Sequence, residues 1–326
     1  MATSGSLEPE IAFGEFLVRI VSLLPSATEL VAALGLTDAL VGCSHECDYP
    51  ARVAALPVCT YPKFDPHGNS GEIHARVTTL LQSALSVYSL HLETLIDLAP
   101  THILTQAQCE VCAVSLGEVQ LAAATQIPSQ PQVISLQPNT LDDLWQDIRT
   151  TAQGLGVAEA TVTDLLASLQ GRVTFCQQQT ATLTHRPTVV CLEWTDPLMG
   201  AGNWVPELVT WAGGDPKLGT IGQHSAWLTW DQLIAVNPEV IVLMPCGFSL
   251  TQTAAAAVDL SRDPHWATLR AVQSQRVYLV DGNQYFNRPG PRLVDSLEIL
   301  AEILHPQRFR FGYEGEGWQV FTHALT

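Results

Sequence analysis

Cysteine and histidine side chains are the groups in this sequence whose types and spacing could do chemistry. Cys109 and Cys112 form a CxxC pair in "TQAQCEVCAVS", and His45 and Cys47 lie in "SHECDYP". Thiolates and imidazoles are preferred ligands of zinc, and CxxC pairs also hold iron–sulfur clusters because neighbouring turns can aim both sulfurs at one centre. Cys246 or His45 could complete a thiolate-rich site for zinc or iron.

Other roles are open for the same residues. The cysteines could be buried thiols that only pack, or the CxxC pair could react, because a helix start predicted at Ser115 would place free N–H groups beside it and lower the thiol pKa values. His45 could instead bind a corrin cobalt or a haem iron as an axial ligand, or cap backbone groups of its own loop.

Composition narrows the classes of partner. The chain has 326 residues, 47% of them apolar, and its 32 acidic and 15 basic residues give a net charge of −17. Nucleic-acid phosphates bind clustered Lys and Arg, so we expect no nucleic-acid partner. We also expect no membrane span, since no apolar run reaches the roughly eighteen residues required. The N-terminus lacks a basic stretch followed by an apolar one, which predicts a cytoplasmic protein as the chain is given, and a periplasmic or extracytoplasmic one if the true start lies upstream.

Short apolar runs alternate with helix-length segments along the chain. The runs are "RIVSLL", "ALVGCS", "HILTQ", "QVISLQ", "TVVCLEW", "EVIVLMPC" and "RVYLVDG". This alternation predicts βα units with buried parallel strands. Helix starts are predicted by pairs at capping-box spacing, namely Ser26 with Glu29, Ser115 with Glu118, and Thr229 with Gln232. Gly35 is expected to end the first helix.

About fifty residues of helical character separate the fourth apolar run from the fifth, and the break at Gly154 to Gly156 predicts two helices. We therefore expect an α/β protein of two Rossmann-like lobes joined by a long backbone helix, with a ligand cleft between the lobes. The predicted parts are an N-terminal extension (1–18), an N-terminal lobe (19–139), a connecting helical segment (140–186), a C-terminal lobe (187–305) and a C-terminal tail (306–326).

Polar and aromatic side chains gather in the loops after the predicted strands, where open α/β sheets bind their ligands. One wall of the cleft would carry the Cys and His residues named above, and the other would carry Glu193, Trp194, Trp204, Cys246, Asn283 and Tyr285. Aromatic faces suit a flat macrocycle because they bury a large apolar area. The sequence contains no GxGxxG, GxxxxGK[ST], HExxH or GxSxG motif, and we therefore expect a binding protein and not an enzyme.

Four segments, "RIVSLLPSATELVAALG", "SHECDYP", "LTWDQLIAVNPEVIVLMPCG" and "NQYFNRPGPRLVDSLEIL", carry a family resemblance. From Arg19 to Leu304 the chain resembles the cobalamin/iron-chelate class of substrate-binding proteins of ABC importers, and its cobalamin-binding members most. The resemblance implies two lobes on a rigid backbone helix, a corrinoid, haem or metal–siderophore ligand, and an ABC permease as partner. It also implies that "GNQYF" is a ligand-contact loop that brings Tyr285 and Phe286 to the cleft.

These observations predict a monomer that binds a cobalamin-like corrinoid or a related metal chelate. The predicted ligand-binding residues are Ser26, His45, Gln106, Glu193, Trp194, Trp204, Phe248, Asn283, Tyr285, Phe286 and Arg288. The predicted metal ligands are Cys47, Cys109 and Cys112, with Cys246 and His45 as further candidates. The alternative is a cytoplasmic enzyme or metal chaperone that handles corrinoids or metals with this cysteine cluster. The segment 63–95 is longer than in the simplest relatives, and the Cys and His residues are additions to the pattern of the best-known cobalamin carriers.

Overall fold

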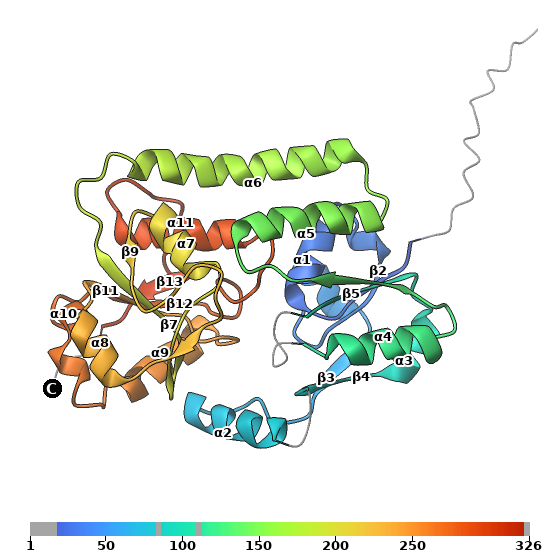
Figure 1. Ribbon diagram of the computed structural model, residues 1–326, viewed down its shortest axis with the longest axis horizontal. Coiled ribbons are helices and arrows are strands. Elements are labelled where there is room, and N and C mark those ends of the chain that lie inside the picture. Colours follow the sequence, from blue (N-terminus) through green and yellow to red (C-terminus); the bar gives the residue numbers. More distant parts are fainter. Residues whose placement is uncertain (1–17, 83–85, 108–112, 323–326) are drawn as a thin grey trace, which may run out of the picture.

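The computed structural model describes residues 18–82, 86–107 and 113–322, which form two α/β lobes (Figure 1). The N-terminal lobe contains a parallel sheet of order β2-β1-β5-β6. Its strands are β1 (Ile20–Ser22), β2 (Leu40–Cys43), β5 (His102–Gln106) and β6 (Gln132–Leu136). Central strands such as β1 are buried on both faces, as continuous apolar runs require. The predicted parallel α/β architecture is confirmed.

Helices α1 (Pro25–Ala33), α3 (Leu92–Leu98) and α4 (Leu116–Thr125) pack around this sheet. A separate antiparallel pair joins β3 (Thr60–Pro62) to β4 (Tyr88–Leu90), and α2 (Ser70–Leu81) lies between these two strands in the chain. Gly35 follows α1 with φ 79°, a left-handed backbone angle that glycine adopts at no steric cost, and it ends the helix as predicted.

The capping box predicted for Ser26 and Glu29 is wrong. Helix α1 begins at Pro25, two residues earlier than that pair requires, and no side chain caps it. Proline fits the first helical position because its missing N–H would have no partner there. This shift places Glu29 inside the helix, where its carboxylate is buried and is available for another role. The capping box of Thr229 with Gln232 is confirmed, and Ser115 accepts from the Glu118 N–H at 3.3 Å.

Two helices connect the lobes, with the break where the sequence predicts it. They are α5 (Leu141–Gly154) and α6 (Glu159–Thr180), and α6 runs along one side of both lobes in Figure 1. A single apolar core extends from β1 and α1 through α5 and α6 into α11 (Leu293–Leu304) of the C-terminal lobe. Because the lobes share this core, apolar packing restrains them along the side that carries α6.

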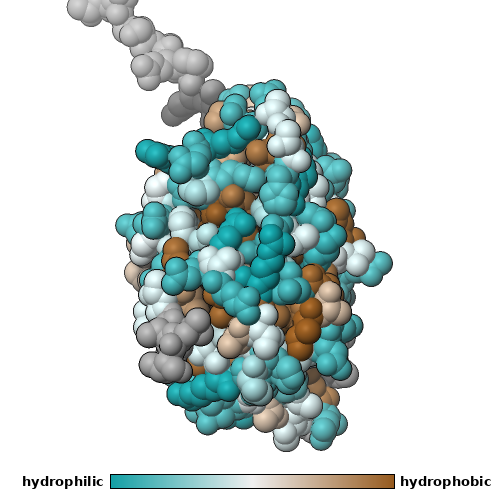
Figure 2. All heavy atoms as spheres, turned by 90° about the vertical axis from the view of Figure 1, so that its left-hand side faces the viewer, coloured by the Kyte–Doolittle hydropathy of each residue, from teal (hydrophilic) through white to brown (hydrophobic). Residues whose placement is uncertain are grey.

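The C-terminal lobe is built on a mixed sheet of order β10-β8-β7-β11-β12-β13, with β9 beside β7. The strands are β7 (Thr188–Thr195), β8 (Leu198–Gly200), β9 (Asp215–Pro216), β10 (Ala226–Trp227), β11 (Val240–Leu243), β12 (Val277–Val280) and β13 (Trp318–Val320). The remaining helices are α7 (Val205–Trp211), α8 (Trp230–Val236), α9 (Leu250–Leu260) and α10 (Arg270–Gln273). Figure 2 shows the end of the molecule at the left of Figure 1, where hydrophilic and apolar side chains are mixed.

The C-terminal segment is part of this lobe and is not a separate tail, which corrects the prediction for 306–326 over its described residues. Strand β13 pairs antiparallel with β12. Trp318 is buried, and its indole N–H donates to Glu302 at 3.0 Å. Phe309 is also buried in the shared core. None of the helices in the described ranges is long and apolar enough to cross a membrane.

Candidate ligand-binding site

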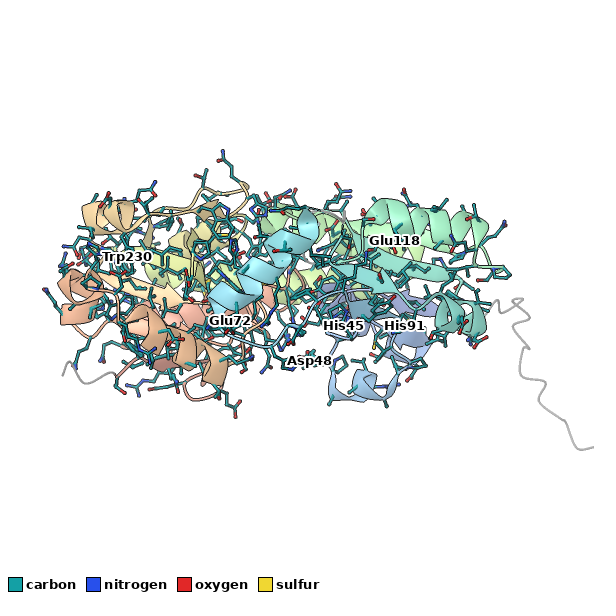
Figure 3. All side chains as sticks on the ribbon, turned by 90° about the horizontal axis from the view of Figure 1, so that it is seen from below. His45, Asp48, Glu72, His91, Glu118 and Trp230 are labelled. Atoms are coloured by element: carbon teal, nitrogen blue, oxygen red, sulfur yellow. The ribbon has the colours of Figure 1, made fainter. Side chains whose placement is uncertain are left out.

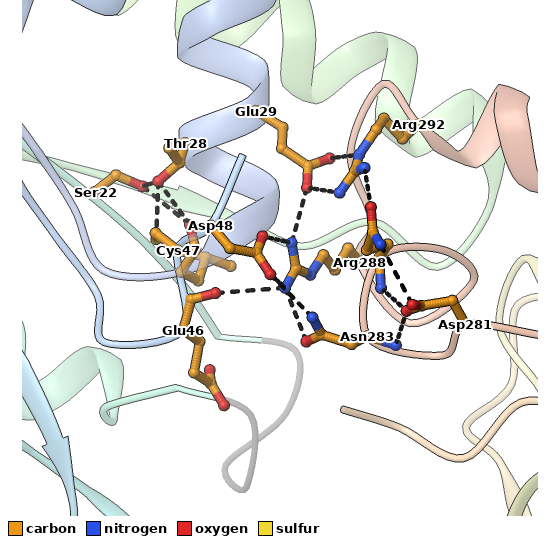
Figure 4. A network of polar contacts seen from close by, with 12 residues as sticks. Ser22, Thr28, Glu29, Glu46, Cys47, Asp48, Asp281, Asn283, Arg288 and Arg292 are labelled. Carbon is orange, nitrogen blue, oxygen red and sulfur yellow. Dashed lines mark hydrogen bonds and ion pairs between the residues drawn. The ribbon is translucent and has the colours of Figure 1, made fainter. Parts of the chain in front are cut away.

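Five charged and polar side chains join the two lobes, and we call them the interlobe clamp: Glu29, Asp48, Asn283, Arg288 and Arg292 (Figure 4). Arg288 donates through Nη1 and Nη2 to the two carboxylate oxygens of Asp48 at 2.5 and 3.0 Å, and through Nη1 to Glu29 at 3.3 Å. Arg292 donates to both oxygens of Glu29 at 3.0 and 2.8 Å. Such paired, charge-assisted bonds are strong and fix orientation, so the clamp holds the lobes at one angle.

Local structure explains how these residues meet. Glu29 lies on α1 and Asp48 in the loop after β2, whereas both arginines come from the segment that leads into α11. In that segment a Cβ on Gly290 would lie 3.1 Å from the Ser26 carbonyl oxygen, so glycine allows the close approach of the two lobes. Ser26, a predicted ligand contact, is buried at this seam, and its ligand role stays a prediction.

A second group of side chains, which we call the central cluster, lies beside the clamp: His45, Glu46 and Tyr88 from the N-terminal lobe, and Glu193 and Cys246 from the C-terminal lobe. All five keep some exposed surface. The Tyr88 hydroxyl donates to Glu46 Oε1 at 2.9 Å, and the His45 ring lies 5.0 Å from the Tyr88 ring. Opposite them, the backbone N–H of Cys246 donates to the Glu193 carbonyl oxygen at 3.2 Å.

Burial and neighbouring charges shift the pKa values in this cluster. Burial, together with the negative charges of Glu193 and Glu46, raises the pKa of the Cys246 thiol to about 12, while Arg288 acts in the opposite direction. This thiol therefore experiences one carboxyl group from each lobe. Burial also raises the pKa of Glu46 and of Glu193 above the ordinary value. Carboxyl groups that are partly exposed yet desolvated are available to form hydrogen bonds with a small ligand.

Helix α2 covers the aromatic side of the second wall. It belongs to the N-terminal part of the chain but packs on the C-terminal lobe, where Ile73 joins Trp194 and Phe248 in one apolar cluster. The Trp194 indole N–H donates to the Ser70 carbonyl oxygen at 3.2 Å, and the hydroxyl groups of Ser70 and Thr195 lie 2.8 Å apart. In Figures 1 and 3, α2 lies across both lobes, on the side opposite α6. The extra length of segment 63–95 thus provides a second bridge between the lobes.

The other aromatic residues predicted to contact a ligand are packed inside the protein. Phe286 is fully buried, and Trp204 is buried with its indole N–H donating to the Phe286 carbonyl oxygen at 2.6 Å. Tyr285 is half-buried beside the Arg292 guanidinium, which lies 5.3 Å from its ring centroid. Gln106 is buried at the end of β5. Trp204 and Phe286 offer little surface to a ligand in this conformation, and their ligand contact stays a prediction.

The predicted metal site falls partly outside the described residues, because Cys109 and Cys112 lie there. Cys47 is buried beside Thr28, with its sulfur 3.1 Å from the Thr28 hydroxyl oxygen. Its pKa is raised by the neighbouring Cys43 and by burial, so it remains a neutral thiol near pH 7. Across 18–82, 86–107 and 113–322, no group of three or more His, Cys, Asp and Glu residues is arranged to hold a metal ion.

Sequence reasoning did not single out Glu29, Glu46, Asp48 or Tyr88 as site residues. Glu46 and Asp48 lie inside "SHECDYP", and acidic residues on either side of the Cys of a strand-end loop are a usable signal. No local pattern marks Glu29 or Tyr88, because their partners lie 259 and 42 positions away along the chain.

Two α/β lobes on a spanning helix, with polar side chains of both lobes converging between them, define a two-lobed ligand-binding protein. The model of the periplasmic binding protein family matches residues 20–283, and the chain belongs to that family. Its members are substrate-binding proteins and not enzymes, which agrees with the expectation from the sequence.

Relatives of known sequence cover nearly the whole chain. An uncharacterized ABC transporter substrate-binding lipoprotein of Bacillus subtilis, YvrC, is 23% identical over 300 residues, which are 90% of this chain and 81% of that protein. The vitamin B12-binding protein of Vibrio cholerae is 22% identical over 299 residues, 88% of each chain. The predicted membership of the ABC-importer class is thereby confirmed.

Solved structures show the same fold. The periplasmic heme-binding protein RhuT from Roseiflexus sp. RS-1 matches with a TM-score of 0.67 and 24% identity over 89% of this chain and 98% of that one. The periplasmic vitamin B12-binding protein BtuF of Vibrio cholerae matches with a TM-score of 0.60 and 21% identity over 88% and 96%. The predicted two-lobed fold is confirmed.

Proposed function

We propose that this protein is the substrate-binding component of an ABC-type uptake system and that it holds a corrinoid, or a closely related metal chelate, between its lobes. The observation that carries the proposal is the central cluster, in which a carboxyl group of each lobe, together with a phenol, an imidazole and a thiol, keeps exposed surface. Polar groups that converge from two lobes can fix the orientation of a small ligand enclosed between them.

The relatives support this choice of ligand class. Vitamin B12 and haem are named for proteins of the same fold, and both are flat metal macrocycles. Trp194 borders the described site and could offer an aromatic face to such a ring if α2 moves aside. The partner would be an ABC permease, and the protein would act as a monomer. Import would require the protein to work outside the cytoplasmic membrane, and cell fractionation tests this localisation.

Titration with cobinamide, cobalamin and haem, followed by absorbance and calorimetry, tests the proposal. Binding of a corrinoid at one site, with a shift of its absorbance bands, is the expected result. Absence of heat and of a spectral shift with all of these macrocycles would overturn it. The alternative, metal handling by the cysteines, predicts stoichiometric zinc or iron in protein purified without chelators, and loss of that metal in Cys109→Ser.

A further inference from the structure

Helix α2 is joined to one lobe and docked on the other. In the chain it lies between β3 and β4, and β4 packs against the core of the N-terminal lobe. Its N-terminal half contacts the C-terminal lobe: Ile73 shares an apolar cluster with Trp194 and Phe248, and the hydroxyl oxygens of Ser70 and Thr195 lie 2.8 Å apart. The lobes therefore cannot separate on this side unless α2 leaves the C-terminal lobe or draws β3 and β4 with it.

Of the connections between the lobes named above, α2 is held by the fewest buried groups. The side that carries α6 contains the shared apolar core. The interlobe clamp contains Glu29, Arg288 and Arg292, whose side chains are at most 10% exposed, and separating buried charges is costly. In α2 only Ser70 and Ile73 are buried among its 12 residues. Because elements with few buried contacts open at a lower free energy than packed cores, α2 should undock while the other connections hold.

The docked helix covers aromatic side chains of the C-terminal lobe. The Trp194 indole N–H donates to the Ser70 carbonyl oxygen at 3.2 Å, and Phe248 is only 6% exposed. Further along α2, the His74 ring meets the Trp227 ring edge-on with their centroids 5.1 Å apart. Side chains of α2 thus occupy the place that a flat ligand would need in order to stack on Trp194 or Phe248, which we call the aromatic wall.

We infer that α2 is a gate on the interlobe site, and this inference rests on the proposed function. The docked helix shields the aromatic wall, and a ligand contacts the wall only after α2 has undocked. Because the ligand binds the undocked state, the apparent dissociation constant rises in inverse proportion to the undocked fraction. Weaker docking therefore gives tighter binding, which is the opposite of what the loss of a ligand contact gives.

Thiol labelling measures undocking without a ligand. Ser70→Cys places a thiol between α2 and the C-terminal lobe, while Asn69 still caps the helix. With a maleimide and peptide mass spectrometry, this thiol should label at least about tenfold faster than Cys191, which is buried in β7. Adding Ile73→Ala should speed its labelling about tenfold or more and leave Cys191 unchanged. Thr78→Cys, at an exposed position of α2, is the matched control, and its labelling should not depend on Ile73.

A reversible disulfide tests whether binding requires undocking. The short distance between the Ser70 and Thr195 hydroxyl oxygens allows Ser70→Cys with Thr195→Cys to form a disulfide, which mass spectrometry verifies. By calorimetry, the oxidised double variant should bind cobinamide at least about tenfold more weakly than the same protein reduced with dithiothreitol. Ser70→Cys alone, treated identically, should bind equally well in both states. Ile73→Ala should bind cobinamide more tightly than wild type, by about the factor by which it speeds labelling.

The outcomes separate the gate from the proposed function. Equal affinity of the oxidised and reduced double variant overturns the gate and leaves binding between the lobes standing. Weaker binding by Ile73→Ala with its unfolding midpoint retained, or a Ser70→Cys thiol that labels no faster than Cys191, also overturns it. Absence of binding of cobinamide, cobalamin and haem by wild type and by Ile73→Ala alike overturns both proposals.

Discussion

The interlobe clamp should be a large contributor to stability, and Glu29→Gln tests this. The Glu29 carboxylate is 2% exposed and accepts three hydrogen bonds from Arg288 and Arg292, whose side chains are 7% and 10% exposed. Glutamine has nearly the same shape but no charge, and only one oxygen. The substitution therefore leaves two desolvated guanidinium groups with less compensation.

The magnitude follows from what each arginine retains. Removing one partner of a buried ion pair costs about 3–5 kcal/mol. Arg288 keeps both oxygens of Asp48, whereas Arg292 keeps only a long contact of 3.5 Å to Gln284 and its stacking on Tyr49 and Tyr285. We therefore expect the lower end of the range, about 3 kcal/mol in the free energy of unfolding.

Urea unfolding, followed by circular dichroism and by tryptophan fluorescence, measures this difference. The matched control is Asp38→Asn, which removes the same kind of charge from the exposed ion pair of Asp38 with Arg52, whose side chains are 88% and 58% exposed. Exposed pairs contribute about 0–1 kcal/mol. A loss for Glu29→Gln no larger than that of the control would refute the reasoning. Coincident transitions by the two probes are expected, because the lobes share one core.

Three further predictions concern the site and its supports. Glu193 has a raised pKa in the folded state, so the folded protein retains a proton that the unfolded protein releases. The stability of wild type should therefore fall as pH rises above about 4.5, and the melting temperature of Glu193→Gln should rise relative to that of wild type over the same pH range. Ile73→Ala should speed amide hydrogen exchange across α2 while β7 stays protected, because Ile73 packs against Phe248 of the other lobe. Trp204→Phe should lower the free energy of unfolding by about 1–3 kcal/mol in urea, since it leaves the buried Phe286 carbonyl oxygen without its donor.

Each of the three has a contradicting result. A melting temperature of Glu193→Gln that falls relative to that of wild type as pH rises would show that the carboxyl group is not desolvated. Unchanged exchange in α2 after Ile73→Ala would mean that other contacts hold the helix. A Trp204→Phe variant as stable as wild type would show that the carbonyl oxygen finds another donor.

The fold was largely predictable because its signals are local. Buried parallel strands appear as apolar runs, and the break at Gly154 to Gly156 marks the division between α5 and α6. Local rules failed where two of them competed: α1 begins at Pro25, two residues before the start that a capping box at Ser26 predicts. The last strand was missed because β13 is short and depends on pairing with β12.

The site was less predictable because its partners are distant in sequence. The loops that face the opposite lobe were identified, since strand ends in α/β sheets are general ligand sites. Which side chains in those loops would bind one another was not readable: Arg288 and Asp48 lie 240 positions apart. The sequence therefore predicts Arg288 only as a ligand contact, and its ion pairs with Glu29 and Asp48 of the other lobe are visible only in the structure; its ligand contact stays a prediction.

The most direct test of the account is hydrogen exchange of the native protein with and without cobinamide. Binding between the lobes predicts slower exchange in peptides of both lobes. These are the peptides that contain Glu46 or Tyr88 in the N-terminal lobe and the peptide that contains Cys246 in the C-terminal lobe. Slower exchange confined to one lobe, or no change at a cobinamide concentration that saturates calorimetric binding, would contradict a site between the lobes.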